Sequence, residues 1–279
     1  MRHYSRVTNG MTAPPAVAVQ FNVSSTACYH KPMPDTRTSL PSPIPLPEQF
    51  FQQDARQLAV ALLGKVIRRR LNGQWLAARI IETEAYLLEE RGSHASLGYT
   101  EARRALFMAP GTIYMYYARG GDSMNCSSLG AGCGVLLKSG HPVVDALSPA
   151  ASLARMQALN PNASGGIRAP ERLCAGQTLL CRSLQIRVPD WNAQRFAADQ
   201  LLLEDDGYQP DQVLRAPRLG IPSGRDEHLF YRWVDAAYSR HCTRNPARRG
   251  QVEGLHYHSL ELEAAQRQAY QESQTCSAT

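Results

Sequence analysis

The feature that most constrains how this chain folds is a long hairpin pattern in its first third. Residues 65–71 have the composition of a β-strand, Asn72-Gly73 is typical of a tight two-residue turn, and residues 74–86 form the returning strand. A turn of this type places its two strands side by side and antiparallel. We therefore expect an antiparallel sheet built around this hairpin.

The returning strand begins with apolar residues and ends in Glu82-Thr83-Glu84-Ala85-Tyr86. Because side chains alternate along a strand, Glu82, Glu84 and Tyr86 share one face. The opposite face is expected to carry Ile81, Thr83 and Ala85. Two carboxylates and a phenol ring on one face at a strand end are typical of a pocket that needs a base and a stacking surface.

The remaining elements mix helices with short strands. Apolar residues at helical spacing predict a helix over 55–63, with Gly64 at its C-terminal end. Residues 111–117 and 134–138 are two further strand candidates. Because the pattern contains no repeat of strand, helix and parallel strand, we expect an α+β domain.

Composition divides the 279 residues into three parts. Residues 1–45 are rich in Pro, Ser, Thr and Ala without periodicity, which predicts a disordered or loosely attached extension in which a targeting role stays open. Residues 46–243 form the compact domain. Residues 244–279 are expected to be a polar tail, either helical near residues 260–272 or disordered.

The formal net charge of +6 is compatible with a polyanionic partner. No apolar run approaches 18 residues, so we expect no membrane span, and the first residues lack the apolar core of a secretory signal. The seven cysteines include no Cys-x-x-Cys pair, which predicts buried reduced thiols in a cytoplasmic protein and no metal site. They are Cys28, Cys126, Cys133, Cys174, Cys181, Cys242 and Cys276.

A second strand supplies aromatic side chains. Tyr114 and Tyr116 share one face, and Tyr117 takes the other. Three tyrosines alone would fit any half-buried sheet. Together with Tyr86 and its neighbouring carboxylates, they offer two aromatic walls and a base, which suits a flat planar group such as a nucleobase.

Six blocks between about residue 47 and about residue 243 resemble, in order, the alkyladenine DNA glycosylase family, the mammalian-type 3-methyladenine DNA glycosylases. They are residues 55–65, Glu82–Tyr86 with His94, residues 107–116, Met124-Asn125 with residues 134–138, residues 173–180, and Arg218–Ile221.

The resemblance implies a single domain with a curved, mostly antiparallel sheet surrounded by helices, and a protruding hairpin. It implies a monofunctional enzyme, without cofactor or lyase activity, that acts as a monomer on damaged purines in double-stranded DNA. The nucleotide is flipped out of the duplex because the scissile bond is hidden in the base stack. Compatible lesions are 3-methyladenine, 7-methylguanine, hypoxanthine and ethenoadenine. In a bacterium such an enzyme is cytoplasmic and associated with the nucleoid.

The resemblance also assigns roles to single residues. Glu84 matches the general base that activates water for attack on the sugar C1′. Tyr86 and Tyr116 match the rings that stack on the two faces of the flipped base. His94, in a loop one residue shorter than the family pattern, matches a residue that contacts the base. Asn125 matches the residue that rejects the 2-amino group of normal guanine.

Lys138 stands where the family commonly has arginine, so it is a candidate for positioning the water or holding a phosphate. The family's wedge residue, which fills the gap left in the duplex, aligns with Arg119, and Tyr117 competes for that role. Arg103 and Arg104 are candidates for phosphate binding. A further cluster of candidates for phosphate binding comprises Arg240, Arg244, Arg248 and Arg249.

Three alternatives differ in what they require of these residues. A non-catalytic binder of damaged DNA has no need for a base at Glu84. An RNA-binding module, which this fold also resembles through the C-terminal domain of methionyl-tRNA formyltransferases, has no use for the pocket formed by Tyr86, Tyr116 and Asn125. An unrelated carbohydrate hydrolase needs an acid pair, and the nearest second acid is Glu82, about 7 Å from Glu84 along the strand.

Overall fold

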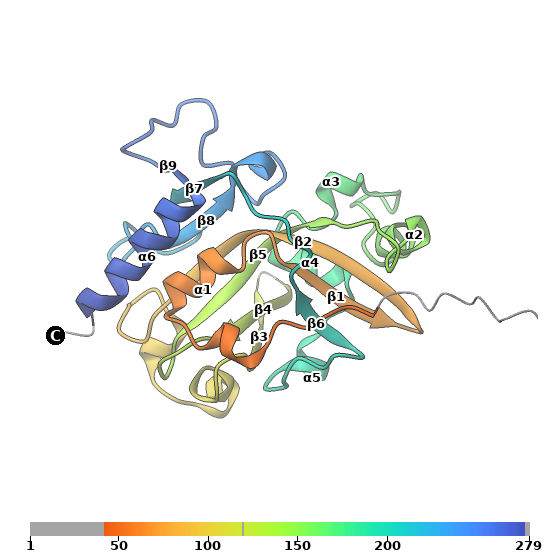
Figure 1. Cartoon of the computed structure of the whole chain (residues 1–279), viewed down its shortest axis with the longest axis horizontal. Coiled ribbons are helices and arrows are strands. Elements are labelled where there is room, and N and C mark those ends of the chain that lie inside the picture. Colours follow the sequence, from red (N-terminus) through yellow and green to blue (C-terminus); the bar gives the residue numbers. More distant parts are fainter. Residues whose placement is uncertain (1–41, 119, 277–279) are drawn as a thin grey trace, which may run out of the picture. The chain divides into compact units, whose positions relative to one another are not determined.

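The computed structural model of the chain describes residues 42–118 and 120–276, shown in Figure 1. These residues belong to one compact unit. The extension expected over residues 1–45 lies almost entirely outside the described part of the chain. Within that part, Pro45 forms an isolated antiparallel bridge with Glu204, so the domain begins at about this residue.

One curved sheet organises the described residues, and every strand pair in it is antiparallel. Its main path runs in the order β3-β4-β5-β2-β8-β7-β9, while β1 pairs with both β2 and β6. The strands are β1 Val66–Leu71, β2 Gln74–Tyr86, β3 Ile113–Ala118, β4 Gly121–Ser127, β5 Gly134–Pro142, β6 Leu201–Glu204, β7 Gln212–Ala216, β8 Arg232–Asp235 and β9 His258–Glu261.

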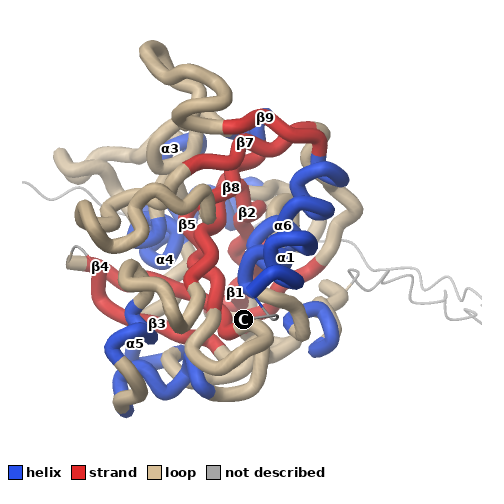
Figure 2. The backbone as a smooth tube through the Cα atoms, turned by 90° about the vertical axis from the view of Figure 1, so that its left-hand side faces the viewer, coloured by secondary structure: helices blue, strands red, loops and turns tan. Residues whose placement is uncertain are grey.

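Helices and short helical turns cover the sheet, which confirms the predicted α+β class (Figure 2). The α-helices are α1 Ala55–Ala61, α2 Ala150–Leu159, α3 Pro170–Leu173, α4 Gln177–Ser183, α5 Val188–Trp191 and α6 Leu262–Cys276. The 3-10 turns are η1 Glu48–Phe51, η2 His94–Leu97, η3 Glu101–Phe107 and η4 Ala236–Tyr238. No helix in the described residues is long and apolar enough to cross a membrane.

The predicted hairpin forms β1 and β2, with Leu71 opposite Gln74. Asn72 and Gly73 have φ angles of 50° and 82°, the left-handed conformation that a type I′ turn requires at both central positions. Asparagine and glycine tolerate this conformation better than other residues. The turn chemistry therefore explains why the two strands meet in this register.

The long strand β2 separates an apolar layer from a polar one. On one face the Thr83 hydroxyl donates to the Ala59 carbonyl of α1 at 2.8 Å, and Ala85 belongs to the main core. Ile81 was expected on this face, and that prediction is wrong. The β2–β5 register shifts around Glu82, and Ile81 instead packs in a second core cluster that includes Val234. A β-bulge of this kind places two successive side chains on the same side.

The segment after residue 243, expected as a separate tail, is packed onto the domain. β9 pairs with β7, and α6 lies beside α1 on the apolar layer (Figures 1 and 2). Ala265 and Ala269 of α6 are 1% and 2% exposed, and Glu272 forms an ion pair with Arg215 at 2.8 Å. A helix whose buried stripe consists of alanines has little hydrophobic signal in the sequence, although it packs closely.

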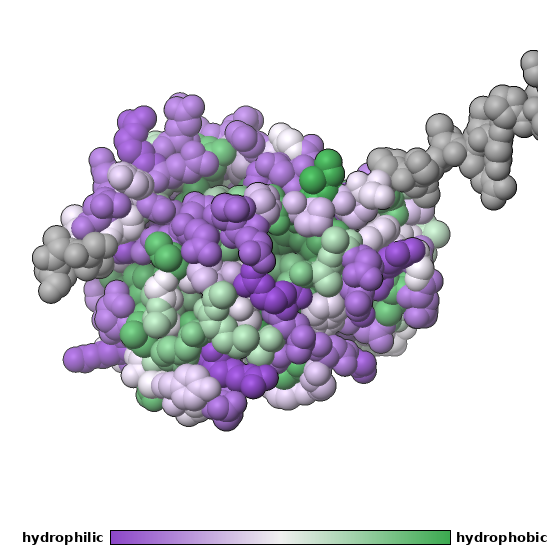
Figure 3. All heavy atoms as spheres, turned by 60° about the horizontal axis from the view of Figure 1, so that its bottom comes forward, coloured by the Kyte–Doolittle hydropathy of each residue, from purple (hydrophilic) through white to green (hydrophobic). Residues whose placement is uncertain are grey.

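The surface itself is mixed. Figure 3 shows one face, on which hydrophobic residues are interspersed with hydrophilic ones. Scattered apolar residues are normal on protein surfaces and carry no functional argument here.

The packing of α6 can be tested with one buried charge. We expect Ala265→Asp to lower the free energy of unfolding by about 2–4 kcal/mol, because it places a carboxylate in the interface with α1. Gln266→Asp, on the exposed side of the same helix, is the control and should change little. Denaturant unfolding measures both, and equal small effects would show that α6 is not part of the folded core.

Candidate active site

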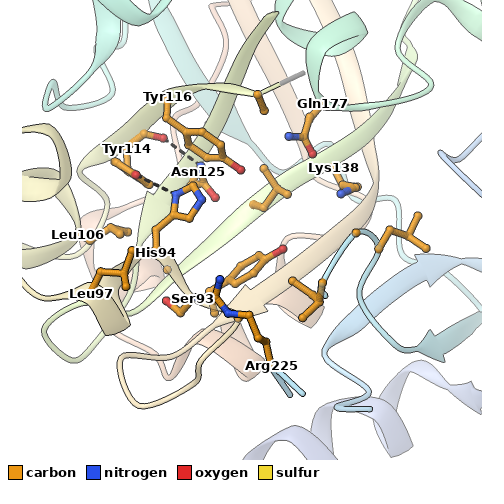
Figure 4. Close-up of a pocket in the computed structure, with 18 of the residues that line it drawn as sticks. Ser93, His94, Leu97, Leu106, Tyr114, Tyr116, Asn125, Lys138, Gln177 and Arg225 are labelled. Carbon is orange, nitrogen blue, oxygen red and sulfur yellow. Dashed lines mark hydrogen bonds between the residues drawn. The ribbon is translucent and has the colours of Figure 1, made fainter. Parts of the chain in front are cut away.

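A cavity of about 420 Å³ opens where β2, β3, β4 and β5 meet the turn η2 and the loop after β7 (Figure 4). Five residues predicted for the site line it: Tyr86, His94, Tyr116, Asn125 and Lys138. They come from five different elements and lie far apart in the sequence. The sheet therefore assembles the pocket that the strand patterns indicated.

Glu84 is fully buried behind the wall of this cavity, and the three residues that donate hydrogen bonds to it all line the cavity. Its carboxylate accepts three hydrogen bonds: from the Tyr86 hydroxyl at 2.7 Å, from Lys138 Nζ at 3.2 Å, and from the Leu219 backbone N–H at 3.0 Å. The first comes from the same strand, β2, the second from the neighbouring strand β5, and the third from the loop after β7. All three donors favour the ionised form.

The pKa of Glu84 follows from these contacts. Burial by itself raises the pKa of a carboxyl group, because the charged form loses its hydration. Here the Lys138 charge, the Leu219 N–H, the Arg232 charge and the Tyr86 hydroxyl outweigh burial, and the pKa of Glu84 is lowered from its usual value. Glu84 is therefore a carboxylate at neutral pH, with its oxygens available as hydrogen-bond acceptors. Burial and the adjacent Glu84 charge raise the pKa of Tyr86 well above its usual value, so Tyr86 remains a hydrogen-bond donor.

A cluster of rings forms another part of the wall. Tyr114 and Tyr116 are stacked with centroids 5.6 Å apart, and the His94 ring meets Tyr116 edge-on at 4.5 Å. His94 Nδ1 lies 3.1 Å from the Tyr114 hydroxyl oxygen, and Figure 4 shows this contact beside Asn125. Tyr114 had no predicted role, but it holds the His94 ring in place.

His94 is held in its neutral form. Partial burial of its ring, followed by the charges of Arg103 and Arg225, lowers the pKa of His94 below its usual value of 6.5. A neutral imidazole has one donor and one acceptor nitrogen, so it can make directional hydrogen bonds to a bound group.

Asn125 is almost completely buried at the back of the cavity. Its Nδ2 donates to the Tyr114 carbonyl oxygen at 3.2 Å, which orients the amide. Its backbone pairs with Tyr114 on one side and with Leu136 on the other. The amide is thus a fixed polar group in a cavity with aromatic walls.

Residues of the loop after β7 support the cavity from behind, and the sequence reasoning gave them no roles. The Arg218 guanidinium lies over the Tyr86 ring at 4.7 Å, and its Nη1 donates to the Ala85 carbonyl oxygen at 2.9 Å. The same nitrogen contacts the carboxylate of Glu90. Leu219, the next residue, donates its N–H to Glu84. The Arg218–Ile221 block was the available signal, because it belonged to the resemblance without an assigned function.

Other predicted residues lie outside the cavity. Arg103 donates to the carbonyl oxygens of His94 and Gly98, so it braces the turn η2. Arg104 is exposed and forms an ion pair with Glu101 at 3.7 Å. Tyr117 is 66% exposed, on the strand face opposite Tyr116. Arg119 lies outside the described residues.

The described residues contain no group of three or more His, Cys, Asp or Glu side chains arranged to hold a metal ion. Five cysteines have described side chains, and all of them are buried and unpaired. Burial raises the pKa of the Cys133 thiol to about 11, so this group carries no charge at neutral pH.

Comparison with known proteins agrees with this architecture. Residues 49–239 match the methylpurine-DNA glycosylase (MPG) family. A protein of Pseudomonas aeruginosa (strain UCBPP-PA14) named "putative 3-methyladenine DNA glycosylase" is 61% identical over 229 residues, which cover 82% of this chain and 93% of that protein. A protein of the same name from Koribacter versatilis is 32% identical over 201 residues, covering 70% of this chain and 92% of its own length. The chain belongs to the methylpurine-DNA glycosylase family, which confirms the resemblance.

The charge state of His94 can be measured directly. In an NMR titration we expect a pKa below 6.5 for this ring, and Arg103→Gln should move it upward because one nearby positive charge is removed. Arg104→Gln is the control, since Arg104 is paired with Glu101 on the surface. An unperturbed pKa of His94 in the wild type, or no response to Arg103→Gln, would contradict the assignment.

Proposed function

We propose that this protein is a DNA glycosylase that removes alkylated or deaminated purines, with Glu84 activating the attacking water. The observation that carries the proposal is the ionised Glu84 carboxylate, which accepts hydrogen bonds from three residues that line an aromatic cavity. The family and its relatives named for 3-methyladenine support DNA carrying alkylated bases as the substrate. A purine in a duplex reaches such a cavity after its nucleotide has been flipped out of the stack.

Glu84 has one hydrogen-bonding direction left for a water molecule. An ionised carboxylate offers about four lone-pair directions, and three are taken by the donors described above. We infer that the remaining direction accepts a hydrogen bond from the nucleophilic water. Lys138 helps to keep Glu84 ionised, because its ammonium nitrogen lies 3.2 Å from a carboxylate oxygen of Glu84.

The proposed reaction is a hydrolysis. The water oxygen forms a bond to the sugar C1′ as the bond from C1′ to the purine nitrogen breaks, and Glu84 takes the proton from the water. The electron pair of the broken bond leaves with the base. A purine alkylated at N3 or N7 carries a positive charge, so it departs as a neutral molecule. An uncharged purine such as hypoxanthine departs as an anion and takes up a proton from solvent. Until then, the Glu84 carboxylate also stabilises the positive charge that develops on the sugar.

Selection of the base follows from the walls of the cavity. Tyr86 and Tyr116 line the cavity from different strands, and we infer that they stack on the flipped purine. His94 provides a neutral polar contact. The fixed amide of Asn125 would meet the 2-amino group of guanine, which would exclude that normal base.

We propose that the enzyme has no lyase activity. Lyase chemistry needs an amine that attacks C1′, and Lys138 is the lysine that lines this cavity. Its ammonium group is paired with Glu84. A protonated amine in an ion pair has no free electron pair, so water is left as the nucleophile.

The catalytic assignment has a direct test. We expect Glu84→Gln to lower the rate of base release by about 10²–10⁴-fold under single-turnover conditions, because the amide cannot accept the proton. Glu89→Gln, an exposed acid on the following loop, is the control. The substrates are duplexes with a single hypoxanthine or ethenoadenine, and methylated DNA. After incubation with the enzyme, strand breaks should appear only when alkali is added, because the proposed enzyme has no lyase activity. Full activity in Glu84→Gln would reject the base, and no release by wild type from any substrate would reject the enzyme.

The wedge that fills the gap in the duplex is proposed to be either Arg119, between β3 and β4 in the sequence, or the exposed Tyr117 near the end of β3. Alanine at the wedge position should weaken binding to a lesion-containing duplex by roughly tenfold or more, with a smaller effect on single-stranded DNA, which has no gap to fill. Arg267→Ala and Tyr270→Ala on α6 are matched controls. If neither Arg119→Ala nor Tyr117→Ala affects duplex binding, the wedge is elsewhere.

A further inference from the structure

A basic segment between η4 and β9 has no role in the site described above. It contains Arg240, Arg244, Arg248 and Arg249, all exposed, and residues 236–252 include no aspartate or glutamate. Within the described part of the chain, none of these arginines forms an ion pair with an acidic side chain. We call residues 240–249 the arginine segment.

A buried network fixes this segment to the strand that carries Glu84. The Glu82 carboxylate is fully buried and accepts hydrogen bonds from Arg232 Nε at 2.6 Å and from the Thr243 backbone N–H at 2.8 Å. The Ser139 hydroxyl also donates to Glu82 and lies 3.0 Å from the Thr243 hydroxyl. A second nitrogen of Arg232 donates to the Arg244 carbonyl oxygen. The backbone at residues 243–244 is therefore held from two sides.

This anchorage brings the backbone at Thr243 close to residues that neighbour the cavity lining in the sequence. Glu82 precedes Glu84 by two residues on β2, a separation of about 7 Å, and both side chains face the polar layer. Ser139 directly follows Lys138, which lines the cavity. Gly176 also lies close to this backbone: a methyl group added at its Cα would be 3.9 Å from the Thr243 hydroxyl oxygen. The next residue, Gln177, lines the cavity. The segment thus lies over the polar layer, on the opposite face of β2 from α1 and α6.

We propose that the arginine segment binds backbone phosphates of the DNA strand that carries the damaged nucleotide. The inference rests on the proposed function, because it takes DNA as the substrate. A flipped nucleotide enters the cavity while its neighbouring phosphates remain outside, beside the mouth. Exposed arginines without acidic partners, on a backbone fixed relative to Glu84, match that negative charge. These contacts hold the DNA in position and read no base.

The test is the salt dependence of DNA binding. Each phosphate contact contributes about −0.9 to the slope of log binding constant against log salt concentration. Arg244→Gln and the double variant Arg248→Gln/Arg249→Gln are each compared with wild type, on an undamaged duplex and on the same duplex with one ethenoadenine, between about 50 and 200 mM salt. We expect Arg244→Gln to reduce the magnitude of the slope by about one, by the same amount on both duplexes.

Arg267→Gln removes an exposed arginine from α6, on the opposite face, and should leave the slope unchanged. Slopes equal to wild type in both arginine-segment variants would overturn the proposal and leave the segment as a surface for another acidic partner. An equal reduction in Arg267→Gln would also overturn it, because the effect would then come from net charge alone. Wild-type protein that shows the expected slopes but releases no base would refute the proposed function and leave this inference intact.

Discussion

The structure depends on keeping one carboxylate ionised although it is shielded from bulk solvent. Glu84 is fully buried, and an isolated buried charge costs several kcal/mol unless donors replace the lost hydration. Its donors come from β2, β5 and the loop after β7, which are separated by long stretches of chain. The order of strands in the sheet can be understood from this requirement, because β2 lies between β5 and β8 and brings all three donors within reach.

Strand β2 serves two environments at once. Thr83 and Ala85 pack against α1 and the main core, while Glu82 and Glu84 face the polar layer. Each acid has its own basic partner, Arg232 for Glu82 and Lys138 for Glu84. The Glu82–Arg232 pair lies where the backbone at Thr243 is anchored. The Glu84–Lys138 pair lies beside the cavity that Lys138 lines.

The sequence was most informative where a local rule decides the structure. The Asn72-Gly73 turn and the alternation along residues 74–86 predicted the hairpin and the shared face of Glu84 and Tyr86. It was least informative where distant segments meet. No local pattern indicates that Arg218 lies over Tyr86 or that Leu219 donates to Glu84, because 135 residues separate the latter pair. The sequence also did not predict the bulge at Ile81 or the buried alanines of α6, because neither changes the hydrophobic periodicity enough to be recognised.

The anchoring of Glu84 by its own strand and by two remote segments has a consequence for how such a site is lost. Since no single segment contains the carboxylate and all its donors, no partly folded fragment can reproduce the geometry. The cavity therefore exists when the whole sheet is assembled and disappears with it in one cooperative step. Protein that exposes its core also loses the pocket, so a damaged or half-made copy cannot cut bases from DNA.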